Sequence, residues 1–438
     1  MTHGSAGADP YVTAHGDTSF GVDHYDLALT YDVRGNRLDA RATLTVRAND
    51  PLRHLELDLH HLHVEKVLVD GTPARHSHKR GRLGVRLVEE LAAGDTAEVA
   101  VMYSGSPKPV RKRHLGTAGW EELADGVIVA GQPHGAPSWF PCNDRPGDKA
   151  SYSIEVTTGS NYVVVSNGEL TSSTRHARTT TWNYRQAEPM APYLATIQIG
   201  KYEVRDVDDA PVPTRLVAPA RLRARLDDAF GRQAEMIETF QRAFGPYPFA
   251  GYTVVVTDDD LEIPLESQSL STFGANLVRS DWDAERLVAH ELSHQWFGNS
   301  LTVGSWRDIW LHEGFACYSE WIWSEESGGP TAHERAEEHR ARLADLPQDL
   351  LLADPGPELM FDDRVYKRGA LCLHALRCTV GDDVFFDLLR SWISEHRYGT
   401  VETVDFTSFV ASRCGDDVDG LFAAWLHEVE LPDLPGPR

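Results

Sequence analysis

The chain has 438 residues, of which 41% are hydrophobic and 25% charged, a composition typical of a globular protein with a sizeable core. Its 66 acidic and 42 basic residues give a net charge of −24, which disfavours nucleic acid and anionic membranes as partners. No stretch approaches the ~18 consecutive apolar residues of a membrane helix, and residues 1–5 lack the basic and apolar regions of a secretory signal. We therefore expect a cytoplasmic location and no membrane partner.

Cysteine usage agrees with that location. The cysteines are odd in number and scattered, and they form no CxxC pair. Reduced thiols are therefore expected rather than a disulfide scaffold. The five residues are Cys142, Cys317, Cys372, Cys378 and Cys414.

The first 205 residues have the pattern of β-strands. Apolar and polar residues alternate in segments such as 25–31 and 42–46, which places the apolar side chains on one face of each strand. Turn-forming pairs separate such segments, namely Asp70-Gly71, Gly94-Asp95 and Asn167-Gly168. We expect an N-terminal antiparallel β domain over residues 1–205.

Beyond residue 205 the apolar spacing becomes helical. Apolar residues recur at this spacing from Leu222 to Phe244, which predicts one long amphipathic helix that ends near Gly245-Pro246. There follow a strand over 252–257, an irregular or edge-strand segment over 262–273, and a second helix from about Ser280-Asp281. The remainder reads as mostly helical, so we expect an α+β fold whose second domain covers residues 206–438.

The segment HELSH at 290–294 carries the strongest chemical signal. On a helix, His290 and His294 lie one turn apart on the same face, so both imidazoles can reach a single metal ion while Glu291 flanks it. The helix is expected to stop at Gly298-Asn299. A five-residue match of this kind also occurs by chance on buried helices, so a third ligand has to decide the interpretation.

Catalytic zinc takes three protein ligands and keeps one position open. The pattern HExxHxxGxxH is excluded because Phe297 and Ser300 stand at its glycine and third-histidine positions. Glu313, 19 positions after His294 in the segment WLHEGFA, is the better candidate. Glu320 lies two turns further on the same helix face, where its carboxylate could orient a ligand.

These residues resemble those of the aminopeptidase N and leukotriene hydrolase family of zinc metallopeptidases, the gluzincins. The pattern stands here as HELSHQWFGNSLTVGSWRDIWLHEGFA. The resemblance extends over almost the whole chain. It includes the loop GQPHGA at 131–136 with WFPCNDRP at 139–146, the segment PMAPYL at 189–194, and VYKRGA at 365–370.

The resemblance implies a saddle-like β domain and a thermolysin-like, mainly helical catalytic domain. It implies one Zn²⁺ held by His290, His294 and Glu313, with Glu291 as general base and Tyr366 stabilising the oxyanion. Glu266, Gln132 and His134 are then expected to bind a peptide substrate through its free N-terminus. We expect the protein to act as a monomer.

The chain departs from the family pattern in two places. The exopeptidase signature Gly-x-Met-Glu-Asn is replaced by PLESQ at 264–268, where Glu266 keeps the glutamate position and Ser267 replaces asparagine. Many members also carry a further helical domain, whereas this chain ends soon after Pro435. We expect a short form with a more open site.

Two alternatives remain at this point. One is an epoxide hydrolase, as in the bifunctional branch of the same family, which needs a long apolar tunnel. The other is a non-catalytic binding scaffold, although such relatives typically lose a ligand or the base. The preferred N-terminal residue is not encoded in any motif that we identify, and another divalent ion could replace zinc.

Overall fold

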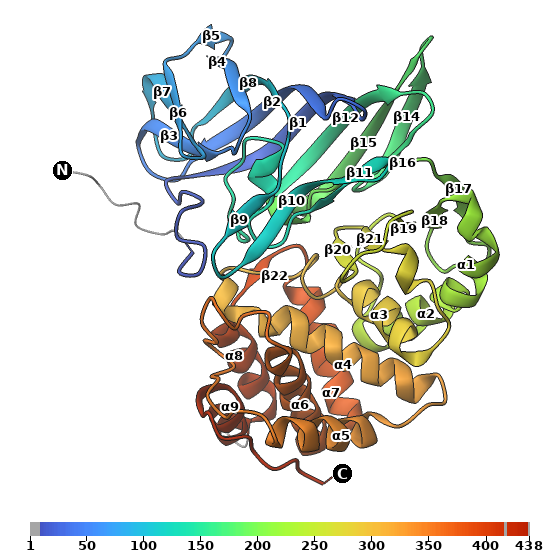
Figure 1. The fold of residues 1–438 in the computed structure, drawn as a ribbon. Coiled ribbons are helices and arrows are strands. Elements are labelled where there is room, and N and C mark those ends of the chain that lie inside the picture. Colours follow the sequence, from blue (N-terminus) through green and yellow to red (C-terminus); the bar gives the residue numbers. More distant parts are fainter. Residues whose placement is uncertain (1–8, 416–417, 437–438) are drawn as a thin grey trace. The chain divides into compact units, whose positions relative to one another are not determined.

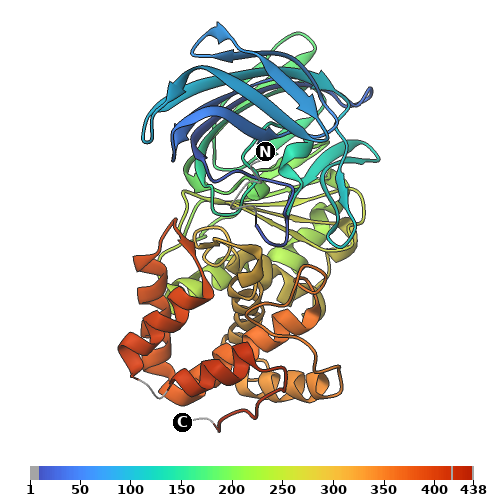
Figure 2. The ribbon, with the colours of Figure 1, turned by 90° about the vertical axis from the view of Figure 1, so that its left-hand side faces the viewer.

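The computed structural model describes residues 9–415 and 418–436, and its chain divides into two compact units (Figures 1 and 2). The first unit comprises Met1–Asp206, Thr214–Leu222 and Phe249–Ala275. The second unit comprises Val207–Pro213, Arg223–Pro248 and Asn276–Arg438. The N-terminal residues 1–5, in which we expect no signal, lie outside the described residues.

An eight-stranded sheet dominates the first unit, with the strand order β14-β15-β12-β1-β2-β8-β4-β5. Strands β1 and β2 pair in antiparallel fashion with Tyr25 opposite Leu44, so the alternating segments form strands as predicted. The sheet is not purely antiparallel, because β1 pairs with β12 in parallel. The strands are β1 (Phe20–Asp32), β2 (Arg37–Ala48), β4 (His63–Val69), β5 (Thr72–Pro73), β8 (Thr96–Gly105), β12 (Ala150–Gly159), β14 (Glu169–Arg175) and β15 (Thr179–Met190).

Two smaller antiparallel sheets complete the N-terminal part of this unit. One has the order β13-β16-β11-β10-β9 and the other the order β3-β7-β6. Their strands are β3 (Leu52–Asp58), β6 (His76–Lys79), β7 (Arg82–Leu91), β9 (Val110–Lys112), β10 (Gly116–Leu123), β11 (Gly126–Ala130), β13 (Val163–Ser166) and β16 (Ile197–Gly200).

A further sheet of the first unit has the order β17-β18-β19-β21-β20. The segment 262–273, expected to be irregular or an edge strand, supplies the edge strand β20 and also the internal strand β21. Its core joins residues from both sides of position 205, because Val165 packs with Val217, Val255 and Leu270. The single boundary at 205/206 therefore differs from the observed division, in which buried apolar contacts hold these later strands in the first unit. The strands are β17 (Glu203–Asp206), β18 (Thr214–Ala218), β19 (Tyr252–Val256), β20 (Leu265–Ser267) and β21 (Leu270–Phe273).

The long helix predicted between Leu222 and Phe244 is wrong, since two helices replace it. α1 (Arg223–Phe230) ends just before Gly231, whose N–H donates to the carbonyl of Asp227, and α2 (Gln233–Phe244) begins two residues later. The apolar period continues across the break, but glycine is a poor residue for a helix interior. Periodicity therefore gives the buried face correctly and misses the interruption.

α3 (Trp282–Ser293) begins where the sequence predicts, because the Asp281 side chain accepts a hydrogen bond from the N–H of Ala284. It ends at Ser293, several residues before the expected stop at Gly298. α4 (Trp310–Glu326) is buried on all sides from Trp310 to Ser324, which is the pattern of a helix inside a core.

α4 packs against α3, α5 and α6. α4 and α6 approach each other closely, since a Cβ placed on Gly314 would lie 2.8 Å from the Cα of Gly369. Within the described residues, no helix is long and apolar enough to cross a membrane. The other elements are α5 (Ala332–Ala344), α6 (Asp363–Val380), α7 (Asp382–Glu395), α8 (Thr403–Cys414), α9 (Asp419–His427), β22 (Thr302–Val303) and β23 (Thr400–Val401).

Candidate active site

Three metal-ligating side chains converge in the second unit. His290 lies in the last turn of α3, His294 follows that helix directly, and Glu313 lies in the first turn of α4. Their ligand atoms all lie within 4.8 Å of one another. Oε2 of Glu313 is 3.4 Å from Nε2 of His290 and 3.5 Å from Nε2 of His294.

The other nitrogen of each imidazole has an acceptor that sets its tautomer. Nδ1 of His290 lies 2.8 Å from Oε1 of Glu320, and Nδ1 of His294 lies 3.0 Å from the carbonyl oxygen of Phe297. Because a carboxylate and a carbonyl only accept, both Nδ1 atoms carry the proton in the neutral rings. The lone pairs of both Nε2 atoms are therefore available to a metal ion that the Glu313 carboxylate also reaches.

The buried carboxylates beside these rings are ionised. Burial alone would raise the pKa of Glu313, but the charge that His294 and His290 carry when protonated holds it well below its usual range. Burial acts against Glu320 in the same way, yet Lys367 and the hydrogen bond from His290 lower its pKa to about 2. Although burial opposes it, Glu313 and Glu320 in turn raise the pKa of His290 to about 9, so a bound cation takes the place of these protons. Two negative charges thus face the imidazoles, as a bound cation requires.

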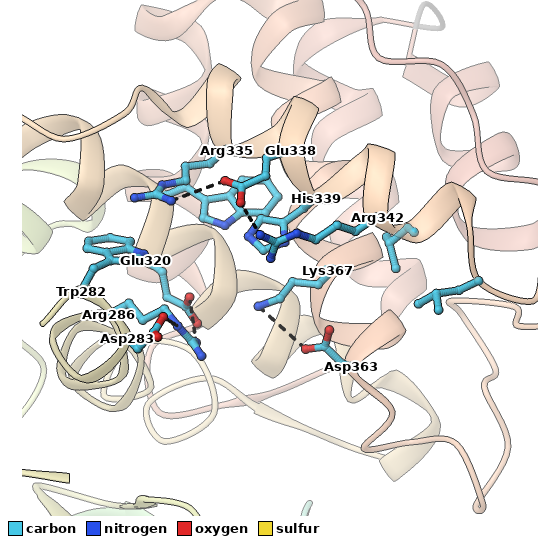
Figure 3. Close-up of a pocket in the computed structure, with 13 residues that line it drawn as sticks. Trp282, Asp283, Arg286, Glu320, Arg335, Glu338, His339, Arg342, Asp363 and Lys367 are labelled. Carbon is cyan, nitrogen blue, oxygen red and sulfur yellow. Dashed lines mark hydrogen bonds and ion pairs between the residues drawn. The ribbon is translucent and has the colours of Figure 1, made fainter.

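Glu320 also lies at the wall of a cavity of about 280 Å³ that is lined mainly by charged side chains (Figure 3). Nη1 of Arg286 donates to Oε2 of Glu320 at 3.2 Å. The ammonium of Lys367, which lines the same cavity, is 3.8 Å from Asp363 and donates to Sγ of Cys317 at 3.2 Å. These two cations stabilise the charge that orients His290.

Glu291 and Tyr366 lie next to the ligand set. Glu291 occupies the position between the two histidines in the sequence and is 4% exposed. Tyr366 is in the first turn of α6, and its ring is nearly parallel to that of His290, with centroids 6.0 Å apart. The close approach of Gly314 to Gly369 joins the helices that carry Glu313 and Tyr366.

The loop that carries Gln132 and His134 belongs to the first unit. It is held close to neighbouring backbone, since a Cβ on Gly131 would lie 2.2 Å from the carbonyl oxygen of Tyr193. Nε2 of His134 lies 3.1 Å from the carbonyl oxygen of Val110 and must therefore carry the proton. Within the described residues, buried Nδ1 of His134 and Nε2 of Gln132 have no hydrogen-bond partner.

Glu266 lies on the edge strand β20 of the first unit, where it pairs with Ser271 of β21. The turn of this hairpin is attached to the end of β15, because Nε2 of Gln268 donates to the carbonyl oxygens of Glu188 and Pro189. The Glu266 side chain is half-buried. The residues that replace the family signature thus form an ordered hairpin that presents Glu266.

Sequence reasoning missed Arg286 and Lys367 as neighbours of Glu320. Arg286 precedes His290 by one helical turn, so the spacing i and i+4 would have placed both on one face of α3. For Lys367 no comparable signal exists, because its contact with α4 depends on how α6 packs.

The donor set fits zinc. Zn–N and Zn–O bonds of about 2.0–2.1 Å in a tetrahedral site separate neighbouring ligand atoms by about 3.3 Å. The observed distances of 3.4 and 3.5 Å match this spacing. Two neutral imidazoles and one carboxylate, each imidazole oriented by a second acceptor, are a ligand set that zinc prefers.

Comparison with known proteins agrees with this geometry. Residues 22–194 match the Peptidase M1 N-terminal domain, and residues 229–425 match the Peptidase family M1 domain. The M1 zinc metallopeptidase from Deinococcus radiodurans is 32% identical, with a TM-score of 0.91 over 98% of this chain and 99% of that chain.

Two curated relatives are more distant and longer. Leukotriene A-4 hydrolase from Xenopus laevis is 26% identical over 98% of this chain and 74% of its own length. Endoplasmic reticulum aminopeptidase 1 from Homo sapiens is 25% identical over 90% of this chain, which spans only 46% of that protein. With both domain models matched and a relative 32% identical over 98% of this chain, the chain belongs to peptidase family M1, a family of zinc metallopeptidases.

Proposed function

We propose that the protein is a zinc aminopeptidase that hydrolyses the N-terminal peptide bond of peptides with a free amino group. The observation that carries this proposal is the convergence of His290, His294 and Glu313. Glu291 lies beside His290 on α3. A variant of the Deinococcus radiodurans M1 enzyme has been solved with a Tyr-Ser-Ala substrate, which supports a peptide as the substrate class.

Zinc, when held by His290, His294 and Glu313, supplies a Lewis acid that polarises the scissile carbonyl and makes a nearby water more acidic. Glu291 then accepts the proton of the attacking water and later delivers it to the leaving amine. Its position supports this role, because Glu291 follows His290 directly on α3 and its side chain is shielded from bulk solvent.

Tyr366 is the proposed donor to the oxyanion that forms as the carbonyl is attacked. A neutral phenol can donate one hydrogen bond to developing negative charge. The parallel arrangement of its ring beside His290 supports the assignment, because it holds the phenol next to the metal ligands. Removal of such a donor typically lowers kcat by about 10²–10³-fold.

The proposed anchor for the substrate's ammonium group consists of Glu266, Gln132 and His134. Glu266 supplies the charge, and a carboxylate–ammonium hydrogen bond is stronger than a neutral one. Burial lowers the pKa of His134 to about 4, so the ring is neutral and its Nδ1 can accept. Buried Nδ1 of His134 has no hydrogen-bond partner within the described residues, so it is available to accept from the ammonium, and Gln132 would accept through its Oε1.

The proposal is tested with chromogenic aminoacyl substrates, measured with and without a chelator, and with a free peptide compared with its N-acetylated form. The acetylated peptide cannot present a cation to Glu266, so we expect kcat/KM to fall by about 30- to 1,000-fold, or about 2–4 kcal/mol. Glu266→Ala should lose this discrimination, whereas Glu262→Ala, an exposed glutamate nearby, should keep it.

Equal cleavage of both peptides by the wild type would point to an endopeptidase. Turnover of a lipid epoxide without peptide cleavage would instead favour the epoxide hydrolase. One bound zinc with neither activity would favour the non-catalytic scaffold.

We also propose that the enzyme is a cytoplasmic monomer. Its five cysteines are all free and four of them are buried, which supports a reducing compartment. Size-exclusion chromatography with light scattering tests the monomer, and a stable dimer at micromolar concentration would contradict it.

A further inference from the structure

A second group of metal-ligating side chains lies on α5 and α6 and shares no residue with the zinc ligands described above. It consists of His333, His374 and Cys378. His333 is the second residue of α5, and α5 packs against α6 (Figure 1). His374 and Cys378 are one turn apart on α6, so both face the same neighbour.

The distances between these ligand atoms suit one tetrahedral ion. Nε2 of His374 is 3.0 Å from Nδ1 of His333 and 3.4 Å from Sγ of Cys378. All three ligand atoms lie within 4.8 Å of one another. Zn–N and Zn–S bonds of about 2.0 and 2.3 Å separate ligand atoms by about 3.3–3.6 Å, so the two distances from His374 Nε2 need to change by only a few tenths of an ångström.

The second nitrogen of His374 has a hydrogen-bond partner, and the second nitrogen of His333 has a carboxylate nearby, beyond hydrogen-bond distance. Nδ1 of His374 lies 3.1 Å from the hydroxyl oxygen of Tyr318, and Nε2 of His333 lies 3.7 Å from Oε1 of Glu337. When these nitrogens carry the protons, the lone pairs of His374 Nε2 and His333 Nδ1 are available to a metal. Partners of this kind are a regular feature of metal-binding histidines.

The cluster is shielded from solvent at His374 and Cys378 and accessible from the side of His333. His374 and Cys378 are 3% and 4% exposed, whereas the side chain of His333 is 27% exposed. An ion can therefore enter past His333 and keep a water as its fourth ligand. Two imidazoles and a thiolate are preferred by borderline-soft ions such as Zn²⁺ and Co²⁺, and not by Mg²⁺ or Ca²⁺.

We propose that His333, His374 and Cys378 form a second site for a divalent zinc-class ion, which links α5 to α6. On binding, the Sγ–H bond of Cys378 breaks, its proton passes to solvent, and a metal–sulfur bond forms. The site is independent of the peptidase chemistry, because the proposed mechanism uses none of these residues.

The experiment is a titration of the zinc-loaded enzyme with Co²⁺. A thiolate bound to Co²⁺ gives a charge-transfer absorption in the near ultraviolet, which His290, His294 and Glu313 cannot produce because none of them is a thiol. We expect one added equivalent of metal with this band. Cys378→Ser should abolish the band and weaken binding at least tenfold, while the matched control Cys414→Ser, on α8, should leave both unchanged.

A second variant, His333→Gln, keeps the proposal testable if substitution of the buried Cys378 disturbs folding. His333 is partly exposed near the start of α5, so its substitution should leave the fold intact. With an unchanged circular dichroism spectrum, this variant should bind the added Co²⁺ at least tenfold more weakly. Added Zn²⁺ should raise the Tm of the wild type and not that of His333→Gln.

Absence of the extra equivalent and of the thiolate band in the wild type would overturn the proposal and leave the cluster as a hydrogen-bonded chain. Wild-type affinity in folded His333→Gln would also overturn it.

Discussion

Glu291 is the residue on which the proposed proton transfer depends. In Glu291→Gln the side chain keeps its size and the metal ligands are untouched, but the amide cannot accept the proton. We expect full zinc content and a kcat lowered by about 10²–10⁴-fold. Metal analysis together with turnover of an aminoacyl substrate measures both quantities. Asp283→Asn, an exposed change on the same helix, should leave both as in the wild type, and normal turnover of zinc-loaded Glu291→Gln would remove Glu291 from the mechanism.

A change at Glu320 tests whether the residue that holds the His290 imidazole in place affects the affinity for zinc. Glu320→Gln keeps a hydrogen-bond acceptor for Nδ1 of His290 but removes the negative charge and its pairing with Arg286. We expect zinc to bind about 10–100-fold more weakly. Competition against a chromogenic chelator measures this, and Glu326→Gln, which is near the exposed end of the same helix, is the control. Equal zinc affinity in Glu320→Gln and the wild type would show that the carboxylate does not orient His290.

Two glycines, Gly314 and Gly369, form a close contact between the helices α4 and α6. In Gly314→Ala the new Cβ would lie 2.8 Å from the Cα of Gly369, so the helices must separate. We expect the free energy of unfolding to fall by about 1–3 kcal/mol. Because Glu313 and Tyr366 are carried by these helices, zinc affinity and kcat should fall as well.

Gly420→Ala, on α9, is the matched control, because no atom lies within 4 Å of its added Cβ. Denaturant unfolding and the zinc competition assay are applied to both variants. A Gly314→Ala protein with unchanged stability and zinc affinity would show that the two helices adjust without cost to the site.

The elements also show where periodicity is informative. The start of α3 follows from Asp281, a local cap, and the edge strand β20 lies within the segment that the sequence singles out. The break between α1 and α2 was missed because the apolar period passes through Gly231 without a gap. The early end of α3 was missed because the turn after it is stabilised by His294 and the carbonyl of Phe297.

For the whole molecule, removal of the metal should abolish activity and leave the protein folded. The second unit has a core of its own, with Trp310, Phe315 and Trp392 almost fully buried, so the metal is not its main source of folding energy. We expect the far-ultraviolet circular dichroism to be unchanged after dialysis against a chelator, and turnover to return when zinc is added. Cooperative unfolding on chelation would contradict this expectation, as would full turnover after verified metal loss.

Features with local causes could be predicted from the amino-acid sequence. The spacing of His290 and His294 places both imidazoles on one face, because neighbouring turns of a helix are set by backbone geometry alone. The alternation in residues 25–31 predicted strands for the same reason. The need for a third ligand made Glu313 the candidate, and the family resemblance then supplied Tyr366, which periodicity could not select from the other phenols.

Contacts between groups far apart in the sequence depend on how the helices pack. Glu313 reaches the histidines because α4 packs against α3, and the carboxylate of Glu320 is held anionic by Arg286 and Lys367 from two other helices. The grouping of His333 with His374 likewise depends on the packing of α5 on α6. Such contacts depend on the volumes and shapes of side chains far apart in the chain, and a hydrophobic period records only which face is buried.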